Sequence, residues 1–554
     1  MLYIPFFSRL SLSEYQGLLT AALFFIVEKL LRVLLLVVPI NLIVDYLPEW
    51  VFSWFKIPQL LGTDKEAEGE FLDDFNSFAE IMDYWGYPYE DHLVETRDGF
   101  LLGTHRITGP RGSRLTETTQ KEHSAESSDS SMSTSNKKPV VLFWHGFMLS
   151  SECFVCHPDW INILPFRLAE AGYDVWLGNS RGNKYSYKHM KYVPNDRRFW
   201  NYSIDEIATI DVPTTVEFIL EETGAENLTY IGFSQGTTQM FMALARNKKL
   251  NKQISRFIAL APASTPRGFH NSIVDYFTKA TPQMLYLMFG RRRAMSLVYF
   301  WINLLPRDLY VAALDFCVKL LFGWTMRNMS QETKSIVYWH LYSFTSVKSI
   351  VHWMQIIRCG KLQMYDEEPP VYPLFWSGAL THWNNDYPLK KIFTRISLFH
   401  GGSDSLSSVQ PLCKDVAAVL DESLCFQHYE HMDFLWADTV GMLVYPKVLE
   451  LMGVRENPDQ IPIDPALEVI LENDTETLSQ ELGSNEYSSA LNDYNGEKHK
   501  LNEEYKDSTL DPESTNTNGT TMLLTPPAIS SGNHKPTLSR RRLPSVSSIG
   551  SVQD

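Results

Sequence analysis

Apolar and polar residues follow two alternating patterns through the middle of the chain, and together they predict a layered fold. Short continuous apolar runs at 140–144, 171–179, 228–233 and 254–260 predict buried strands. Residues 205–222 instead repeat their apolar positions at helical spacing. Strands that alternate with helices in this way predict an α/β fold with a mostly parallel central sheet and helices on both faces.

Two segments before this region have patterns of their own. Apolar residues recur at helical spacing in 71–85, which predicts a short amphipathic helix. Residues 92–107 form two strand-like runs on either side of Asp98-Gly99, which is a strong signal for a β-hairpin. Farther along the chain, 392–400 and 424–428 predict the last strands of the sheet.

Two insertions and a tail divide a predicted α/β domain over 70–453. Residues 108–138 are rich in Ser, Thr and charge, and we expect a disordered insertion there. The strand and helix alternation stops at about 264–389, where long apolar and aromatic stretches predict a helical cap over the sheet, with ordinary core helices as the alternative. Residues 454–554 lose apolar density and predict a disordered, acidic and Ser-rich tail.

The N-terminal 50 residues are the most apolar part of the chain. Glu28, Lys29 and Arg32 divide this segment into apolar runs of about 10–12 residues, whereas a span needs about 20. A membrane span that buries these charges, a monotopic hairpin and an interfacial helix all remain open. We expect residues 1–50 to be a retained, membrane-associated segment, because no small-residue cleavage site follows the apolar run.

Composition narrows the classes of function. The formal net charge of −16 argues against nucleic acid as a partner. Much of this charge lies in residues 455–554, which contain 17 acidic and 8 basic residues. Six cysteines in 554 residues are too few for a disulfide framework. Cys153 and Cys156 form the chain's one C-x-x-C pair, so we predict no metal site and no cofactor. Arg540-Arg-Arg-Leu-Pro-Ser545 resembles a basophilic kinase site and marks the tail as a possible phosphorylation target.

The candidate chemistry begins at Ser234. It lies in Gly232-Phe-Ser-Gln-Gly236, which matches G-x-S-x-G between the apolar run at 228–233 and a helix-forming stretch at 237–245. In a strand-turn-helix of this kind, the glycines permit a sharp turn that exposes the serine hydroxyl above a sheet. The pentapeptide alone also fits an ordinary turn, so the assignment of Ser234 as a nucleophile depends on partners elsewhere in the chain.

A nucleophilic serine needs a histidine base and a carboxylate that orients it, and in α/β hydrolases they follow the serine in the order acid, then histidine. Asp404 lies in a glycine-containing loop directly after a predicted strand. His431 lies in the loop after the last predicted strand, and we prefer it to His428, which strand alternation places against the sheet. Asp433 and Asp386 remain rivals for the acid.

Ester hydrolysis also requires two N–H donors for the tetrahedral oxyanion. Gln235 follows the nucleophile and can provide one backbone N–H group. Phe147, in His145-Gly-Phe147 at the end of an early strand, is placed to provide the second. We expect His145 to be a structural residue of this loop.

Several of these stretches together resemble the acid lipase family. They are 79–88, the Asp98-Gly99 hairpin, His145-Gly-Phe147, 171–183, Gly232-Phe-Ser-Gln-Gly236, 402–406 and 431–434, within a resemblance that covers about 75–452. The N-terminal apolar segment and the stretch 347–357 are more similar to the membrane-anchored fungal steryl ester hydrolases than to the secreted members. Phe147 and Met148 depart from the family, which often has leucines there, as do the 108–138 insertion and the long tail.

The resemblance implies an α/β-hydrolase fold with Ser234, Asp404 and His431 as catalytic triad and the amides of Phe147 and Gln235 as oxyanion donors. It implies a lipid-droplet or endoplasmic-reticulum enzyme, with its catalytic domain in the cytosol, that releases fatty acid from steryl esters. Triacylglycerol is a second expected substrate. An esterase or acyltransferase acting on another ester would use the same residues, and a catalytically inactive scaffold is the remaining alternative.

Overall fold

A computed structural model describes residues 77–113, 138–264, 280, 282–295, 305–367, 386–407 and 409–455. The predicted membrane segment at 1–50, nearly all of the insertion at 108–138 and nearly all of the tail at 454–554, including Ser545, lie outside the described residues. Within the described residues, no helix has both the length and the apolar character needed to cross a membrane.

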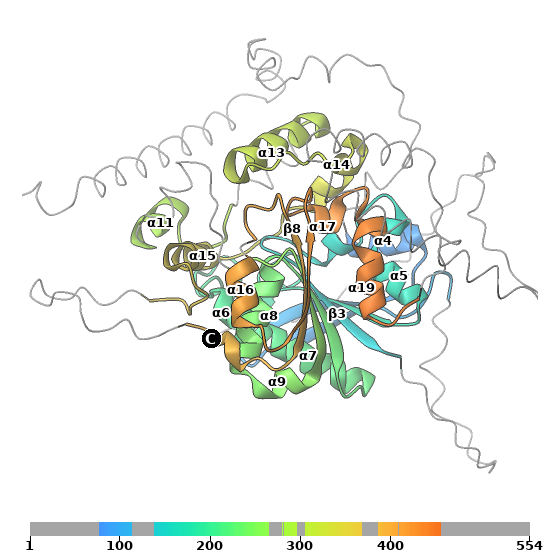
Figure 1. The fold of residues 1–554 in the computed structure, drawn as a ribbon. Helices are drawn as coiled ribbons and strands as arrows, with labels where there is room; N and C mark the ends of the chain where they lie inside the picture. Colours follow the sequence, from blue (N-terminus) through green and yellow to red (C-terminus); the bar gives the residue numbers. More distant parts are fainter. Residues whose placement is uncertain are drawn as a thin grey trace, which may run out of the picture. The chain divides into compact units, whose positions relative to one another are not determined.

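A central β-sheet runs through the described part of the chain, with strand order β1-β2-β4-β3-β6-β7-β8-β9 and β5 paired to β2 (Figure 1). The strands are β1 (Tyr89–Glu95), β2 (Phe100–Ile107), β3 (Val140–Trp144), β4 (Asp174–Gly178), β5 (Lys188–His189), β6 (Leu228–Phe233), β7 (Ile254–Leu260), β8 (Arg395–Gly401) and β9 (Leu420–Phe426). β2 pairs antiparallel with β1, β4 and β5, whereas the pairings along β4-β3-β6-β7-β8-β9 are all parallel. The predicted strands, the mostly parallel sheet and the hairpin at Asp98-Gly99 are therefore confirmed, with one correction. The last strand spans 420–426 and not 424–428, so His428 lies in the turn after β9 and the prediction that places it against the sheet is wrong.

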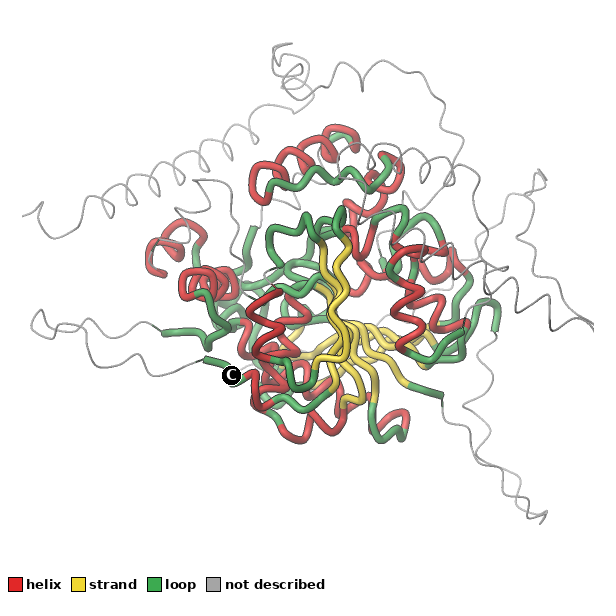
Figure 2. The backbone as a smooth tube through the Cα atoms, in the orientation of Figure 1, coloured by secondary structure: helices red, strands yellow, loops and turns green. Residues whose placement is uncertain are grey.

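Helices cover both faces of this sheet (Figures 1 and 2). One face packs against α4 (Phe78–Trp85), α5 (Leu164–Glu170), α17 (Asp433–Trp436), α18 (Val440–Leu443) and α19 (Tyr445–Leu451). The other packs against α6 (Ile204–Glu206), α7 (Val212–Thr223), α8 (Gln235–Arg246), α9 (Lys248–Gln253) and α16 (Val409–Asp415). β3 shows the alternation that makes this possible, because Val141 and Phe143 join the first core and Leu142 and Trp144 the second.

One predicted helix is interrupted. The pattern at 205–222 predicts a continuous helix, but the structure has α6, a wider π turn over Ile207–Asp211, and then α7. Pro213 follows the wide turn and has no N–H to donate to the preceding turn. The turn also presents Asp211 to the buried guanidinium of Arg181, at 2.6 Å, which hydropathy spacing does not encode.

The chain between β7 and β8, called the insertion below, contains α11 (Pro282–Phe289), α13 (Arg307–Phe322), α14 (Gln331–Val337) and α15 (Val347–Cys359). It contacts loops at the carboxyl ends of the strands. Ser343 N–H donates to the carbonyl of Met148 after β3, at 2.6 Å, and Ser405 Oγ after β8 donates to the carbonyl of Phe322, at 2.9 Å. The insertion therefore borders the edge of the sheet where ligands bind in α/β folds.

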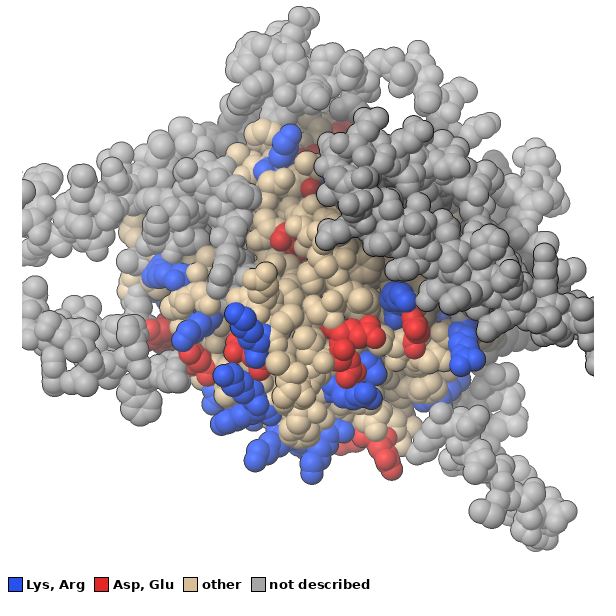
Figure 3. Space-filling model, in the orientation of Figure 1, with Lys and Arg blue, Asp and Glu red and all other residues tan. Residues whose placement is uncertain are grey.

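Basic side chains gather at the opposite end of the face drawn in Figure 3, around α7 and α9. Lys248, Lys249 and Lys252 of α9 are exposed there, and Lys249 pairs with Glu217 at 2.8 Å.

Candidate active site

Ser234 lies at the sharp turn between β6 and α8. Its backbone has φ 51° and ψ −120°, a conformation that side-chain-bearing residues rarely adopt. Ser234 N–H donates to the carbonyl of Leu260 at 3.0 Å, and Thr237 N–H donates to the carbonyl of Ser234 at 2.9 Å. Strand β6 and helix α8 thus hold a strained turn, and the hydroxyl of Ser234 lies at the carboxyl end of the strands.

The turn needs glycine because backbone approaches it closely. A Cβ on Gly236 would lie 2.3 Å from the carbonyl oxygen of Trp144, so any side chain there would force β3 and α8 apart. A Cβ on Gly146 would lie 3.0 Å from the Cβ of Ser234. The loop after β3 is therefore in contact with the nucleophile turn, as a shared site requires.

The structure brings Ser234, His431 and Asp404 into one hydrogen-bonded chain. Ser234 Oγ lies 2.7 Å from His431 Nε2, and His431 Nδ1 lies 2.7 Å from Asp404 Oδ2. All three side chains are buried. An ionised Asp404 accepts from Nδ1–H, which leaves Nε2 free to take the serine proton.

Asp404 is fixed in turn by its own loop after β8. Leu406 N–H donates to Asp404 Oδ1 at 2.8 Å, so one carboxylate oxygen binds the loop and the other binds the histidine. The rivals are directed elsewhere: Asp433 Oδ2 accepts from Asn328 and from the N–H of Glu430, and Asp386 pairs with Lys361 at 3.1 Å.

Asp433 differs from Asp404 in its environment as well as its contacts. Burial, opposed by the hydrogen bond from Asn328, raises the pKa of Asp433 to about 7. A carboxyl group with that pKa is partly protonated near neutral pH, so it is a poor permanent partner for an imidazolium. His428, the alternative base, offers its carbonyl to Asn328 at 2.9 Å and does not reach the serine in the described contacts.

The predicted oxyanion donors, Gln235 and Phe147, belong to the two segments that meet at Ser234. Gln235 is the first residue of α8, so its N–H precedes the helical hydrogen bonds and points out of the helix terminus. Phe147 belongs to the loop that contacts Ser234 through Gly146. His145 in the same loop is structural, because its Nε2 accepts from Ser180 N–H at 3.0 Å and burial lowers its pKa to about 4.

Sequence patterns did not identify Trp324, a residue of the insertion that lies against His431. Its ring stacks on His431 with centroids 5.2 Å apart and planes 8° apart. Phe233 lies near the same imidazole, with centroids 5.3 Å apart, and Phe322 stacks on Trp324. The imidazole is therefore held between aromatic rings from the sheet and from the insertion.

The backbone of the insertion also binds the histidine loop directly. Glu430, next to His431, accepts from Thr325 N–H at 2.8 Å through one carboxylate oxygen and from Met326 N–H at 2.8 Å through the other. Asn328 donates to Asp433 Oδ2 at 2.7 Å and to the carbonyl of His428 at 2.9 Å. The position of the insertion and the position of the base are thus coupled.

Helix α15 makes a separate contact with the oxyanion side of the site. Trp353 Nε1 donates to Gln235 Oε1 at 2.5 Å, and both side chains are buried. This bond holds the side chain of Gln235, the residue that directly follows Ser234. Hydropathy spacing marks Trp353 only as one more apolar position of a helix.

The described residues contain no group of three or more His, Cys, Asp or Glu arranged to hold a metal ion. Cys153 and Cys156 are both buried, and burial raises the pKa of both thiols. Thiols in such surroundings stay protonated and are poor metal ligands and poor nucleophiles.

Comparisons with known proteins agree with this geometry. The family described as a partial alpha/beta-hydrolase lipase region matches residues 78–158, and the alpha/beta hydrolase fold family matches 139–293. A probable lipase of Schizosaccharomyces pombe is 38% identical over 446 residues, which are 79% of this chain and 93% of that protein. A second probable lipase of the same organism is 37% identical, covering 83% of this chain and 95% of its own. The gastric triacylglycerol lipase of Rattus norvegicus is 33% identical over a region that covers 68% of this chain and 91% of that lipase.

The chain belongs to the acid lipase family of α/β hydrolases. As a member of this family it is a carboxylic ester hydrolase of the lipase class, and the predicted fold and family are confirmed to that extent.

Proposed function

We propose that this acid lipase hydrolyses steryl esters to free sterol and fatty acid, with Ser234 as nucleophile, His431 as general base and Asp404 as its orienting carboxylate. The observation that carries the mechanism is the hydrogen-bonded chain from Ser234 Oγ through His431 to Asp404, with 2.7 Å at each step. The same order of residues along the sequence is the order expected for this fold.

The reaction runs in two halves. His431 Nε2 takes the proton of Ser234 as Oγ attacks the ester carbonyl, and the N–H groups of Phe147 and Gln235 bind the oxyanion that forms. His431 then protonates the departing sterol oxygen, which leaves an acyl-serine. Water, deprotonated by the same Nε2, attacks the acyl carbonyl and releases the fatty acid and free Ser234. Asp404 stabilises the imidazolium in both halves.

Two considerations support the choice of substrate. The apolar N-terminal segment and the stretch 347–357 resemble the fungal steryl ester hydrolases, and two fungal relatives named as probable lipases match over most of their length. A relative named as a gastric triacylglycerol lipase supports triacylglycerol as a second substrate. We further propose that residues 1–50 hold the enzyme at a lipid droplet or the endoplasmic reticulum, with the catalytic domain in the cytosol.

The test is a substrate panel on the purified full chain. Steryl oleate, triolein and a short water-soluble ester are compared for parent and Ser234→Ala, and folding is checked by thermal unfolding. We expect Ser234→Ala to lower hydrolysis of every accepted ester by about 10⁴-fold or more while unfolding is unchanged. Near-parental activity in that variant would refute the mechanism.

The same panel separates the alternative substrates. Preference for steryl oleate over triolein supports the proposed substrate, and preference for the short ester supports a general esterase. Acyl transfer to an added sterol that exceeds hydrolysis would instead favour an acyltransferase, which uses the same acyl-serine. Deleting residues 1–50 should lower activity on emulsified lipid and spare activity on the soluble ester; equal loss on both would contradict the anchoring role.

A further inference from the structure

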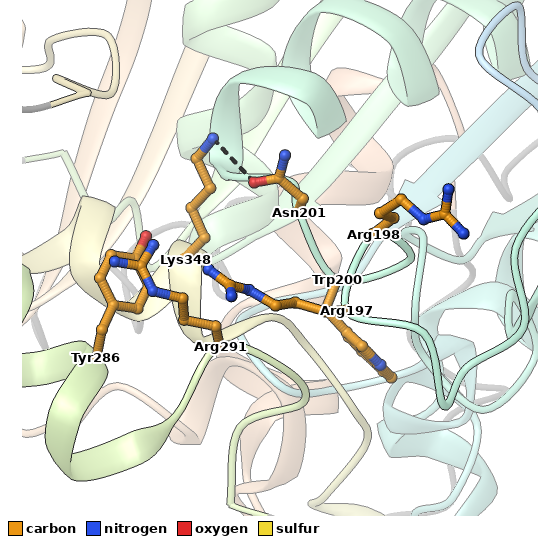
Figure 4. A pocket seen from close by; sticks show the side chains of 7 residues that line it. All are labelled: Arg197, Arg198, Trp200, Asn201, Tyr286, Arg291 and Lys348. Carbon is orange, nitrogen blue, oxygen red and sulfur yellow. Dashed lines mark hydrogen bonds between the residues drawn. The ribbon is translucent and has the colours of Figure 1, made fainter.

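A cationic cavity lies at the start of α15, outside the catalytic chain. It has a volume of about 340 Å³ and is lined by Arg197, Arg198, Trp200, Asn201, Tyr286, Arg291 and Lys348. Figure 4 shows Arg197 extending toward Arg291, whose guanidinium lies over Tyr286, and the amine of Lys348 extending toward Asn201, whereas Arg198 extends away from the other side chains. Three cations from three separate stretches of the chain therefore line one hollow.

The protein holds these cations in place through neighbouring backbone and rings. Ala294 N–H donates to the carbonyl of Thr345 at 2.8 Å, and Val347 N–H donates to the carbonyl of Arg292 at 2.9 Å, which ties the arginine-rich loop to the start of α15. The guanidinium of Arg291 lies over the ring of Tyr286, 3.9 Å from its centre.

The cations are only partly neutralised. No acidic side chain among the described residues lies within ion-pair distance of Arg197 or Arg291. Lys348 Nζ pairs with Glu367 at 2.7 Å and lies 3.5 Å from Asn201 Oδ1, but the Glu367 side chain is 77% exposed. Because the Glu367 side of this pair is open to solvent, a stronger anion could replace its carboxylate on Lys348, whose side chain is only 10% exposed. Arg198, in contrast, is paired with Asp196 at 2.6 Å.

Exposed apolar side chains lie beside the cavity on the same segment. Leu287 and Phe289 of α11 are 57% and 39% exposed, and Met295, just after the arginines, is 46% exposed. Large apolar residues next to basic ones are typical of elements that lie in the interface of an anionic lipid surface. A site for a free small anion would not need this apolar border.

We propose that the cavity binds the phosphate of a phospholipid headgroup, while Leu287, Phe289 and Met295 enter the acyl layer beside it. Arg197 and Arg291 provide planar donor pairs that match phosphate oxygens, and Lys348 provides a third charge at the base of the hollow. The phosphate replaces the carboxylate of Glu367 on Lys348. This inference rests on the proposed function for its assumption that the enzyme works at a lipid surface.

The cavity lies on the same helix, α15, that contacts the residue after Ser234. Lys348 and Trp353 lie on the same helix, about 7.5 Å apart along its axis, and Trp353 binds the side chain of Gln235. A headgroup held at Lys348 would orient the insertion so that the catalytic serine faces the lipid from which the ester must arrive.

The test measures binding without turnover. The full chain carrying Ser234→Ala is purified in detergent, and calorimetry compares dihexanoyl phosphatidic acid, dihexanoyl phosphatidylcholine and inorganic phosphate. We expect phosphatidic acid to bind most tightly, and Arg197→Gln with Arg291→Gln to weaken it by about tenfold or more. Arg198→Gln is the matched control, because it removes a neighbouring exposed arginine that points away, and should change binding by less than about twofold. Glu367→Gln should tighten binding, a gain that damage to the fold cannot produce.

Three outcomes would overturn the proposal. They are no binding of phosphatidic acid, equal loss in Arg198→Gln, and inorganic phosphate binding as tightly as the lipid, which would mean a site for a free anion. The catalytic proposal is judged separately, by hydrolysis of the short soluble ester with Ser234 present. The double arginine variant should keep that activity and lose activity on droplets coated with phosphatidic acid.

Discussion

At the residue scale, the imidazole of His431 is confined by more than its two triad partners. Trp324 is nearly parallel to the ring and Phe233 lies near it, while Asp404 and Ser234 occupy its two nitrogens. A protonated imidazole against an aromatic face gains cation–π attraction. We therefore expect Trp324 to restrict the ring's orientation and, in the proposed mechanism, to stabilise the charge that forms on His431.

Replacing Trp324 should slow the chemical step. We expect Trp324→Leu to lower kcat on a short soluble ester by about tenfold with little change in KM, because the ring acts on the base and not on substrate binding. Trp324→Phe should restore most of the activity, since it keeps an aromatic face. Trp339→Leu is the control, because Trp339 lies in the same insertion but packs on Tyr310. A Trp324→Leu enzyme that lost only affinity for substrate would contradict this role.

Sequence reasoning could find the three side chains that form the hydrogen-bonded chain, but not Trp324. Chain order and loop position distinguish Asp404 and His431 because catalytic groups of this fold follow the ends of strands. Asp433 and Asp386 could be set aside only once the geometry showed what each carboxylate contacts. The contact of Trp324 with His431 joins two segments far apart in the chain, and no local pattern specifies such packing.

At the scale of elements, the insertion and the histidine loop are joined by buried hydrogen bonds that local patterns do not predict. Glu430 is buried and accepts from both Thr325 and Met326. Strand and helix positions followed from hydrophobic patterns, because the central strands are buried on both faces and give continuous apolar runs, whereas a helix that buries one face repeats its apolar positions at helical spacing. The π turn at Ile207–Asp211 and this loop pairing did not, since both depend on where a distant partner lies.

Glu430→Gln should loosen this junction. The carbonyl oxygen of the new glutamine side chain can still accept from one N–H group. Its NH₂ group, however, would face the other N–H donor. One buried N–H group is then left without an acceptor, at a cost of about 1–3 kcal/mol. We expect faster hydrogen exchange at residues 325–328 and a severalfold lower kcat. Asp438→Asn is the matched control, because Asp438 binds Ser330 and Thr333 of the same insertion but lies away from His431. Equal loss of kcat in both variants would show that only general stability had changed.

At the scale of the whole molecule, ionisable side chains are buried in the core around β2, β3 and β4. Glu152 is fully buried, and although burial opposes ionisation, contacts with His340 and Lys184 hold its pKa at about 2. Its contribution to stability is therefore present above about pH 4.5 and is lost as the pH falls toward 2. His340 belongs to the insertion, so this carboxylate also joins the insertion to the core.

Buried histidines should make the protein sensitive to acid before Glu152 titrates. Burial lowers the pKa of His105 and His157 to about 3 and that of His145 to about 4. Each histidine binds a proton in the unfolded chain below about pH 6.5 but stays neutral in the fold, so acid favours unfolding. We expect the free energy of unfolding to fall by roughly 1.4 kcal/mol per pH unit for each histidine below about pH 6.

Thermal or urea unfolding of the full chain from pH 7.5 to 4 tests this expectation, and His105→Gln provides the internal comparison. The His105 ring stacks on Phe78 with centroids 4.0 Å apart, and its Nδ1 lies 2.9 Å from Ser151 Oγ. The variant should therefore be less stable than the parent at pH 7.5. Because it has one titrating histidine fewer, its stability should fall less steeply with acid, and the two curves should converge by about pH 4.5. Parallel curves would mean that His105 is protonated in the folded protein and that its burial does not control acid stability.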